Sequence, residues 1–516
     1  MRRRYGPLNA GHRGRSALTA AQVPLRRRVA RLGWLTLGLM SLTLALLAVA
    51  AWVALRAGPQ DVIGKLPLGA DDNIPSLSLV LAAGAGIASL FLGLAALHAS
   101  AAMRVLARDR RIPDPLSPEM RKLRSAVLAP LGPGTQRLVT EPEPPLSKLP
   151  EPTVVPGQLR LTVLIPAHDE SLTIAATLDS LWGQTRPPDK VIVVADNCTD
   201  DTAEIARQRG ADVLATIGNH DKKAGALNQA LAEIFPGTDR EDVTMIMDAD
   251  SVIVPEFLET AMSRLAADPD LIAVGGVFYG EDGAGLVGQL QRNEYTRYQR
   301  YIARRLGKVF VLTGTASLIR TYALKAVADS RGSLIPGDPG HVYDTLAMTE
   351  DNEMTLALKS LGAKMVSPMQ CRVVTELMPT WHALWRQRMR WQRGALENIA
   401  AYGVTRATLR YWLQQIGIGY GTIALNAYLL LMLITLLAAD GFEIVWLWFA
   451  IGLIFVAERV VTVWAVGRRG RLVAAPLFIE IGYDLVLQAV YLKSLVDIAS
   501  GRQAGWNYVP REAVTQ

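Results

Sequence analysis

The chain has 516 residues, 50% hydrophobic against 20% charged, which is too long for one compact domain and apolar for a soluble enzyme. Its two cysteines, Cys198 and Cys371, exclude a disulfide framework or a cysteine-built zinc site, so we expect reduced thiols in a cytoplasmic compartment. Its six histidines have no spacing typical of a metal site, and its net charge of +7 could suggest a nucleic-acid partner.

The basic charge is concentrated in an amino-terminal tail. Residues 1–33 hold nine arginines and no acidic residue, so the rest of the chain is slightly acidic. A long apolar run follows directly. Basic residues next to a membrane span usually lie on its cytoplasmic side, so the tail indicates a membrane protein with a cytoplasmic amino terminus. We therefore expect no nucleic-acid partner.

Several apolar stretches are candidates for membrane spans. Residues 34–55 and 76–97 are each 22 residues long without a charge, and a spanning helix needs roughly 20 residues. We predict two transmembrane helices within residues 34–98, the first retained as an anchor because it is too long for a simple signal peptide. About three more are predicted within residues 415–500, at 416–439, 444–467 and 472–492.

The distribution of basic residues predicts the orientation. The amino terminus and the loop at 467–471 should be cytoplasmic and residues 56–75 outside, which describes a multi-pass protein of a bacterial-type inner membrane. The side of the tail at 501–516 stays open, because a re-entrant helix would reverse it. Glu480 and Asp484 share one helical face, where they either pair with neighbouring residues or line a polar path.

The middle of the chain is predicted to be a cytoplasmic α/β domain. A linker at residues 99–157 carries six prolines between 141 and 157, too many for a helix or a central strand. Over residues 158–378, apolar runs alternate with helical patterns, which predicts a mostly parallel sheet. The expected strands are 161–165, 191–195, 213–215 and 243–247, with helices ending at 182, spanning 203–209, and beginning at 223 and 255.

Acidic side chains follow these strands, where the ligands of a parallel sheet bind. Asp200 or Asp201 is expected to cap the next helix. Asp248 and Asp250 lie one residue apart after a buried run, so both carboxylates face one side and suit Mg²⁺ or Mn²⁺, with phosphate oxygens completing the shell. The other residues in such positions are Pro166, Asp169, Glu170 and Asp196.

Five ordered motifs between residues 159 and 402 resemble those of the membrane-embedded family-2 glycosyltransferases, the cellulose, chitin, hyaluronan and poly-N-acetylglucosamine synthases. Asp169 stands where many relatives have Asn, which puts only that contact in doubt. The motifs are Asp169-Glu170 with Asp196, Lys223-Ala224-Gly225-Ala226-Leu227-Asn228, Asp248-Ala249-Asp250, Thr349-Glu350-Asp351, and Gln387-Arg388-Met389-Arg390-Trp391.

The resemblance implies a GT-A-like nucleotide-sugar transferase domain with a role for each motif. The nucleoside and phosphates would be bound by Pro166, Asp169, Glu170, Asp196, Lys223, Asp248 and Arg390. The metal would lie on Asp248 and Asp250, where it stabilises the leaving diphosphate. Within Thr349-Glu350-Asp351, Asp351 would be the general base for the incoming hydroxyl.

The same resemblance implies an acceptor site beside the membrane. Gln387 and Trp391 would contact the growing chain, and Gly314 would let the backbone approach the sugar closely. Aromatic and apolar residues alternate with arginines over 381–399, which predicts an amphipathic helix among interface helices at 379–414.

Our leading hypothesis is an inverting, processive transferase. It would polymerise a hexose or N-acetylhexosamine from a UDP-sugar into a β-linked polysaccharide and pass the polymer across the bilayer, with possible accessory export proteins. A second hypothesis is transfer of one sugar to a lipid or glycan. A third is a catalytically silent transporter or scaffold. The sequence leaves the donor sugar open.

Overall fold

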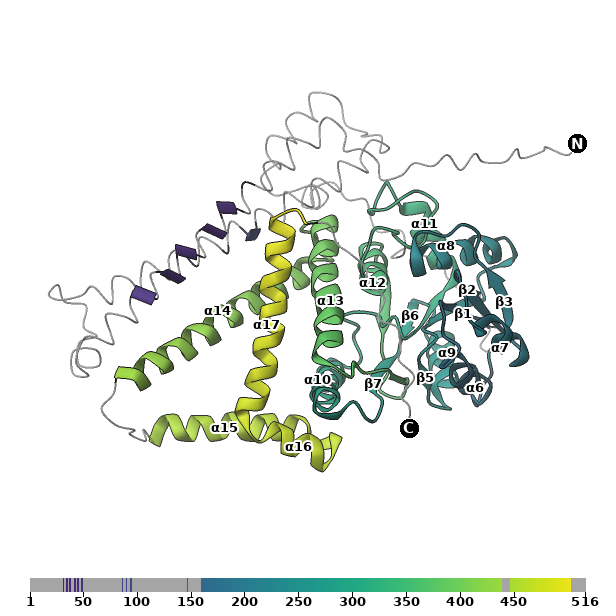
Figure 1. The fold of residues 1–516 in the computed structure, drawn as a ribbon. Coiled ribbons are helices and arrows are strands. Elements are labelled where there is room, and N and C mark those ends of the chain that lie inside the picture. Colours follow the sequence, from purple (N-terminus) through teal and green to yellow (C-terminus); the bar gives the residue numbers. More distant parts are fainter. Residues whose placement is uncertain are drawn as a thin grey trace, which may run out of the picture.

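The structure is a computed structural model that describes residues 159–438 and 446–502, with Leu146 and isolated residues between 31 and 94. The predicted spans 34–55 and 76–97 and the linker 99–157 therefore lie outside the described residues as continuous segments. Figure 1 shows an α/β domain with a group of long helices, α13 to α17, beside it. The candidate site lies where these two parts meet.

A seven-stranded sheet forms the centre of the α/β domain. Strand β1 pairs in parallel with β2 and β4, β2 with β3, and β6 with β9, whereas β8 runs antiparallel between β4 and β6. The predicted mostly parallel sheet and its four strands are confirmed, while the sequence did not predict β8. In spatial order the strands are β3 (Asp212–Ala215), β2 (Lys190–Ala195), β1 (Arg160–Ala167), β4 (Asp242–Met247), β8 (Ala316–Arg320), β6 (Leu271–Gly275) and β9 (Lys364–Val366).

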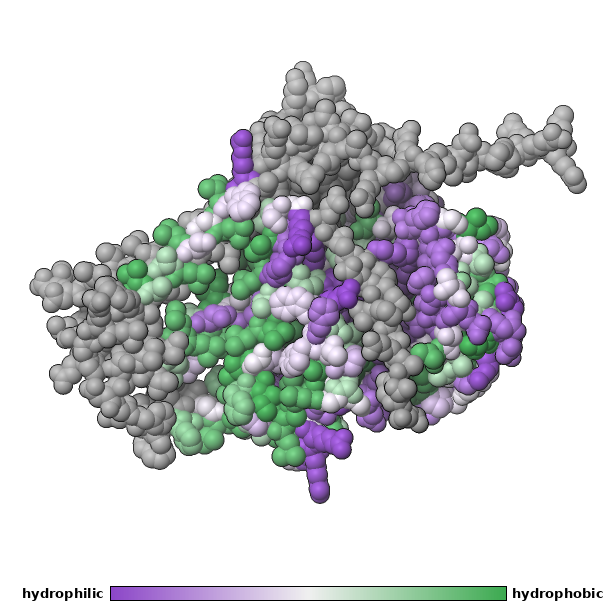
Figure 2. All heavy atoms as spheres, viewed as in Figure 1, coloured by the Kyte–Doolittle hydropathy of each residue, from purple (hydrophilic) through white to green (hydrophobic). Residues whose placement is uncertain are grey.

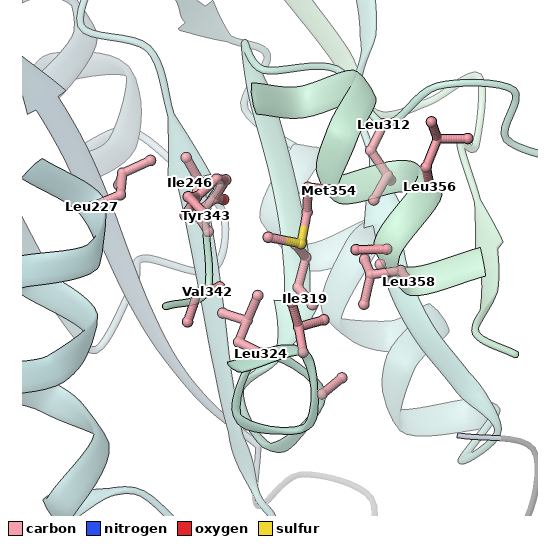
Figure 3. Packing of buried hydrophobic residues seen from close by; sticks show 14 of the residues in the cluster. Leu227, Ile246, Leu312, Ile319, Leu324, Val342, Tyr343, Met354, Leu356 and Leu358 are labelled. Atoms are coloured by element: carbon pink, nitrogen blue, oxygen red, sulfur yellow. The ribbon is translucent and has the colours of Figure 1, made fainter. Parts of the chain in front are cut away.

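Both faces of this sheet are buried, because successive side chains of a strand point to opposite faces. In β1, Val163 belongs to one core cluster and Leu164 to the other, and both side chains are fully buried. Figure 3 shows the second cluster, in which Ile246 and Ile319 of the sheet lie near Leu324. One face is covered by α8 (Lys222–Ile234), α11 (Thr321–Ser330) and α12 (Glu350–Ser360), the other by α6 (Ile174–Trp182), α7 (Thr202–Gln208) and α9 (Phe257–Ala267).

A small second sheet brings distant acidic residues together. It consists of β5 (Val252–Ile253), β10 (Arg372–Thr375) and β7 (Val277–Gly280), with β10 antiparallel to β5. Asp250 precedes β5 and Glu376 follows β10, so the antiparallel pairing places both carboxyl groups at the same end of the sheet. Partial burial raises the pKa of the Asp250 carboxyl group, and the nearby charge of Glu376 raises it further.

The long helices begin after the α/β domain. Helix α13 (Trp381–Tyr402) packs against α12 and α17 (Leu477–Ala499), while α14 (Leu409–Ala438) and α15 (Trp446–Thr462) extend away from the sheet (Figure 1). Helices α10 (Gly285–Arg304) and α16 (Arg468–Ala474) contact each other near the lower ends of α13 and α17 (Figure 1). Helices thus occupy the three predicted apolar stretches of the carboxyl-terminal half.

The hydrophobic surface of the molecule lies over these long helices. Figure 2 shows apolar side chains gathered there, whereas the exposed face of the α/β domain is mostly hydrophilic. Within the described residues, no single helix is long and apolar enough to cross a membrane, although α16 and α17, bent by 79°, meet that test as a pair. Large exposed apolar side chains on α14 and α15 include Leu413, Tyr420, Leu453, Ile454 and Phe455.

The two carboxylates on α17 pair with arginines. Glu480 lies 2.6 Å from the Arg297 guanidinium and 3.1 Å from that of Arg459, and Asp484 lies 2.9 Å from Arg459. Of the two sequence interpretations, pairing with neighbours therefore describes both residues. Asp484 also lines the cavity described next.

Candidate functional site

A cavity of about 790 Å³ lies between the α/β domain and helices α13, α14 and α17. It brings together predicted site residues whose motifs lie more than 150 positions apart in the sequence, such as Lys223 and Trp391. The predicted site residues on its wall are Lys223, Asp248, Asp250, Gly314, Thr349, Glu350, Asp351, Gln387, Arg390 and Trp391. The predicted nucleoside residues Pro166, Asp169, Glu170 and Asp196 do not line it.

Lys223, near the start of α8, joins two of these motifs. Its Nζ lies 2.5 Å from Asp248 Oδ1 and 2.8 Å from Glu350 Oε1. Burial opposes the charged form, but the two carboxylates outweigh it and raise the pKa of Lys223 well above its usual value. The lysine is therefore a fixed positive charge in the cavity wall.

The Asp248 and Asp250 carboxylates are candidates for holding a metal. Burial, with the charge of Asp250 adding to it, raises the pKa of Asp248 to about 6, and burial also raises the pKa of Asp250. Burial, with the charges of both aspartates adding to it, raises the pKa of Glu170, in the loop after β1, to about 7. These carboxylates lie close enough to disfavour one another's ionised forms. A divalent cation would relieve that repulsion, and carboxylate oxygens are the ligands that Mg²⁺ and Mn²⁺ prefer.

A different trio, Asp169, Cys198 and Asp200, has ligand-type atoms within 4.8 Å of one another. Hydrogen bonds of the local loop explain this proximity. Asp169 Oδ1 accepts from the Thr199 N–H at 2.6 Å, and Asp200 Oδ1 accepts from the Thr202 N–H at 3.0 Å. Asp200 thus caps α7 as expected, whereas Asp201 makes no side-chain cap bond. Asp169 holds the loop after β2.

Asp196 anchors the region predicted to bind the nucleoside. Its Oδ1 accepts hydrogen bonds from Asn219 Nδ2 at 2.7 Å and Thr216 Oγ1 at 2.9 Å. Gly225 lies directly against this loop, since a Cβ atom there would come 2.0 Å from Asn219 Oδ1. The glycine in the Lys-Ala-Gly motif therefore permits the loop that orients Asp196, a role not inferred from the sequence.

The predicted base lies at the start of α12. Asp351 Oδ2 accepts from the Gly314 N–H at 3.2 Å, and Oδ1 accepts from the Asn352 N–H at 2.7 Å. Burial, with the charge of Glu350 adding to it, raises the pKa of Asp351 to about 6. Although burial opposes it, Lys223 lowers the pKa of Glu350. Glu350 is thus held ionised, and Asp351 is suited to accept a proton near neutral pH.

Helix α13 and the segment before β8 form another part of the cavity wall. Gln387 Oε1 and Thr315 Oγ1 are buried and make no hydrogen bond within the described part of the chain. Both residues contribute to the cavity wall, although these two oxygen atoms are themselves almost fully covered. The Arg388 guanidinium lies 4.3 Å from the centroid of the Trp391 ring, covering the aromatic side chain predicted to contact an acceptor.

The sequence missed several residues of this wall. Glu294 and Tyr298 on α10 line the cavity, and Glu294 accepts from Arg388 Nη2 at 2.8 Å. Arg388 lies inside a predicted motif, but no pattern in the sequence indicated its partner 94 positions away. In the predicted apolar face of residues 381–399, Leu396 is buried, whereas Trp381 is 44% exposed.

Comparison with known proteins bears on this site. Residues 156–394 match the family described as "Glycosyltransferase like family 2". These residues form a family-2 glycosyltransferase domain. The domain contains the mostly parallel sheet and all five predicted motifs, which confirms the predicted α/β glycosyltransferase class.

Two curated relatives match just under half of the chain. The chain is 25% identical over 243 residues to the poly-beta-1,6-N-acetyl-D-glucosamine synthase of Staphylococcus aureus (strain COL). It is 28% identical over 249 residues to the probable glycosyltransferase YdaM of Bacillus subtilis (strain 168). Each match covers 46% of this chain and 55% of the relative, so the chain spans about half the length of these relatives.

Two solved structures were also similar. The Pyrobaculum calidifontis mannosyltransferase PcManGT, in complex with GDP-Man and Mn²⁺, has a TM-score of 0.43 at 17% identity, covering 79% of this chain and 100% of that one. Glucosyl-3-phosphoglycerate synthase from Mycobacterium tuberculosis has a TM-score of 0.33 at 19% identity, covering 48% and 79% of the two chains.

The substitution Gly225→Ala tests the packing beneath Asp196. Because its Cβ atom would overlap Asn219, we expect the free energy of unfolding to fall by about 1–3 kcal/mol, measured by chemical denaturation. Gly237→Ala is the matched control, because nothing lies within 4 Å of a Cβ atom there. Equal stability of the two variants would contradict the role of Gly225.

Proposed function

We propose that this protein is an inverting, membrane-integrated glycosyltransferase that polymerises a hexose or N-acetylhexosamine from a UDP-sugar. The observation that carries the proposal is the single cavity lined by Asp248 and Asp250, by Lys223 and Asp351, and by Trp391 on α13. Groups for the leaving diphosphate, for the proton of the acceptor and for an acceptor sugar thus face one space. The similarity to a poly-N-acetylglucosamine synthase supports a sugar of this class.

The acidic pair and the cations around it would bind the donor diphosphate. Asp248 and Asp250 would hold Mg²⁺ or Mn²⁺, which supplies positive charge to the leaving group when bound. Lys223 adds a fixed charge beside them. Arg390 also lines the cavity, and its planar guanidinium can contact two phosphate oxygens at once.

Transfer would take place in one displacement. Asp351 accepts the proton of the acceptor hydroxyl, the hydroxyl oxygen bonds to the anomeric carbon, and the bond from that carbon to the phosphate oxygen breaks, its electron pair leaving with UDP. A single displacement inverts the anomeric carbon. A UDP α-sugar therefore yields a β linkage.

The residues that line the cavity support a polymer as product. Its wall includes side chains from α14 and α17 that are mainly amide, hydroxyl or apolar groups, among them Gln415, Thr422, Leu425, Gln488 and Tyr491. A neutral polysaccharide could follow this wall away from Asp351. The exposed apolar side chains of α14 and α15 (Figure 2) support the placement of these helices in a bilayer.

Asp351→Asn is expected to lower the rate of sugar transfer roughly 10²- to 10⁴-fold, because it removes the proton acceptor. UDP affinity should stay close to that of the wild type, since Asp351 lies on the acceptor side. Both are measured on the purified full chain, by UDP release and by calorimetry. Turnover at the wild-type rate would exclude Asp351 as the base.

Asp250→Ala is expected to abolish the gain in UDP affinity that Mg²⁺ or Mn²⁺ provides, together with transfer, because one carboxylate ligand is lost. Titration of UDP with and without the metal measures this gain. Asp270→Ala, at an exposed position after α9 that does not line the cavity, is the control. If the Asp250 variant kept metal-dependent binding, the ligands would have to be other residues.

Trp391→Ala is expected to reduce chain elongation about tenfold while changing UDP-sugar hydrolysis little, because an aromatic ring contributes about 1 kcal/mol or more to stacking. Product length and UDP release measure the two rates. Trp385 lies on the same helix but does not line the cavity, so Trp385→Ala is the matched control. Equal losses in both reactions would argue against contact with the acceptor.

A further inference from the structure

Helix α13 contacts the Thr349-Glu350-Asp351 segment through one stripe of its surface. Residues 387, 391, 394 and 398 follow one another at spacings of four, three and four, so they lie along one face of the helix. The first two, Gln387 and Trp391, line the cavity. The last two, Gly394 and Asn398, meet the segment that carries Asp351.

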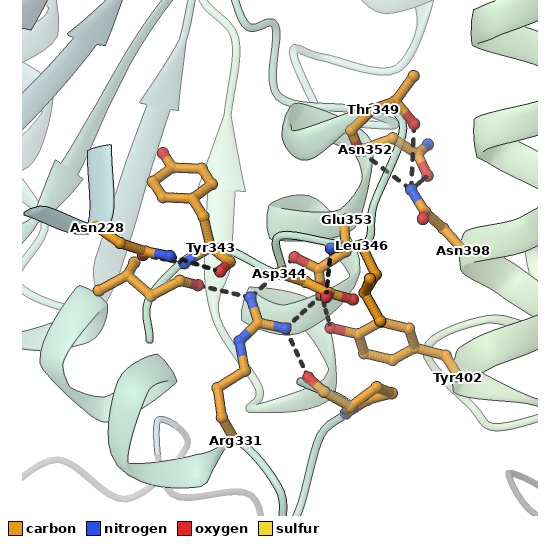
Figure 4. Close-up of polar contacts among 12 residues, drawn as sticks. Asn228, Arg331, Tyr343, Asp344, Leu346, Thr349, Asn352, Glu353, Asn398 and Tyr402 are labelled. Carbon is orange, nitrogen blue, oxygen red and sulfur yellow. Dashed lines mark hydrogen bonds and ion pairs between the residues drawn. The ribbon is translucent and has the colours of Figure 1, made fainter. Parts of the chain in front are cut away.

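Asn398 holds this segment on both sides of Glu350 and Asp351. Its Nδ2 lies 3.1 Å from the Thr349 carbonyl oxygen, from Thr349 Oγ1 and from Asn352 Oδ1 (Figure 4). Asn398 is 3% exposed, so no solvent competes for these bonds. The contacts fix residues 349 and 352, which flank Glu350 and Asp351.

Gly394 allows the helix to approach closely enough for these bonds. A Cβ atom at this position would lie 2.5 Å from Thr349 Oγ1 and 2.8 Å from its Cγ2. Thr349 has a short, branched side chain that cannot move aside without moving its backbone. Any side chain at position 394 would therefore displace the beginning of α12.

We propose that Asn398, together with Gly394, positions the Asp351 carboxylate for catalysis from the helix that carries the acceptor residues Gln387 and Trp391. Asn398 is a positioning residue, since it reaches the reacting groups only through Thr349 and Asn352. The inference rests on the proposed function of Asp351 as general base. It makes the geometry of the base depend on the same helix that contacts the acceptor.

A second bond between the same two helices provides a matched control. One turn after Asn398, the Tyr402 hydroxyl donates to Glu353 Oε1 at 2.6 Å. Glu353 also pairs with the buried guanidinium of Arg331, so it keeps a partner without Tyr402 (Figure 4). Tyr402→Phe thus removes an α12–α13 hydrogen bond without touching the residues that flank Asp351.

The test uses the purified full chain with the variants Asn398→Ala, Gly394→Ala and Tyr402→Phe. We expect the first two to lower kcat by about tenfold to hundredfold while the Kd for UDP stays within about twofold, as for a misplaced catalytic group. Hydrogen exchange of the amides at 350–353 should become faster in both. Tyr402→Phe should leave kcat and this exchange close to the wild type, even if it lowers the melting temperature.

Several results would overturn the inference. One is an unchanged kcat in Asn398→Ala, and another is an equal loss of kcat in Tyr402→Phe, which would show that helix packing alone matters. If Asn398→Ala does not fold, the kcat of Gly394→Ala tests the inference, and an unchanged kcat in that variant would overturn it. Activity retained in Asp351→Asn would instead refute the assignment of Asp351 as the base. In that case, or if the wild type shows no turnover, hydrogen exchange at 350–353 alone decides whether Asn398 holds the segment.

Discussion

The Lys223 ammonium lies between Asp248 and Glu350 and forms the contacts on which the arrangement of the site depends. It joins the start of α8 to the turn after β4 and to the start of α12, two segments whose carboxylates would otherwise repel each other. Removing the lysine from this group, whose side chains are 23% to 29% exposed, would leave the carboxylates without their cation, which costs more than losing a fully exposed pair. One lysine thus holds the acidic pair and the Asp351 segment in register.

The site also depends on the meeting of two different architectures. The parallel strands end beside the acidic pair, as expected for ligands of an α/β sheet, but the opposite wall comes from α13, α14 and α17. Helix α13 contributes to both, since it presents Trp391 to the cavity and Asn398 to the segment before α12. The proposed donor and acceptor groups are therefore positioned by elements in direct contact, so a change on one side can be transmitted to the other.

The sequence predicted the local elements well and the long-range contacts less completely. Strands with buried apolar runs, such as β1 and β4, and the motif residues Asp248, Asp351 and Trp391 could be found because their signals are local. The antiparallel β8, the approach of Glu376 to Asp250 and the Glu294–Arg388 pair could not, because they result from strand pairing and helix packing between distant segments. The hydrogen bonds of the predicted nucleoside residues could not be predicted either, because each joins two different loops: Asp169 accepts from Thr199 after β2, and Asp196 accepts from Asn219 before α8.

The central claim is that the cavity transfers sugar from a nucleotide diphosphate to a growing chain. The most direct test measures UDP release by the purified, detergent-solubilised chain with Mg²⁺ or Mn²⁺ and, in turn, UDP-glucose, UDP-N-acetylglucosamine, UDP-galactose and UDP-glucuronate, with product size resolved on gels. We predict metal-dependent release with one donor and a long β-linked product. A single-sugar product would contradict polymerisation, and no release with any of the four donors would contradict the account.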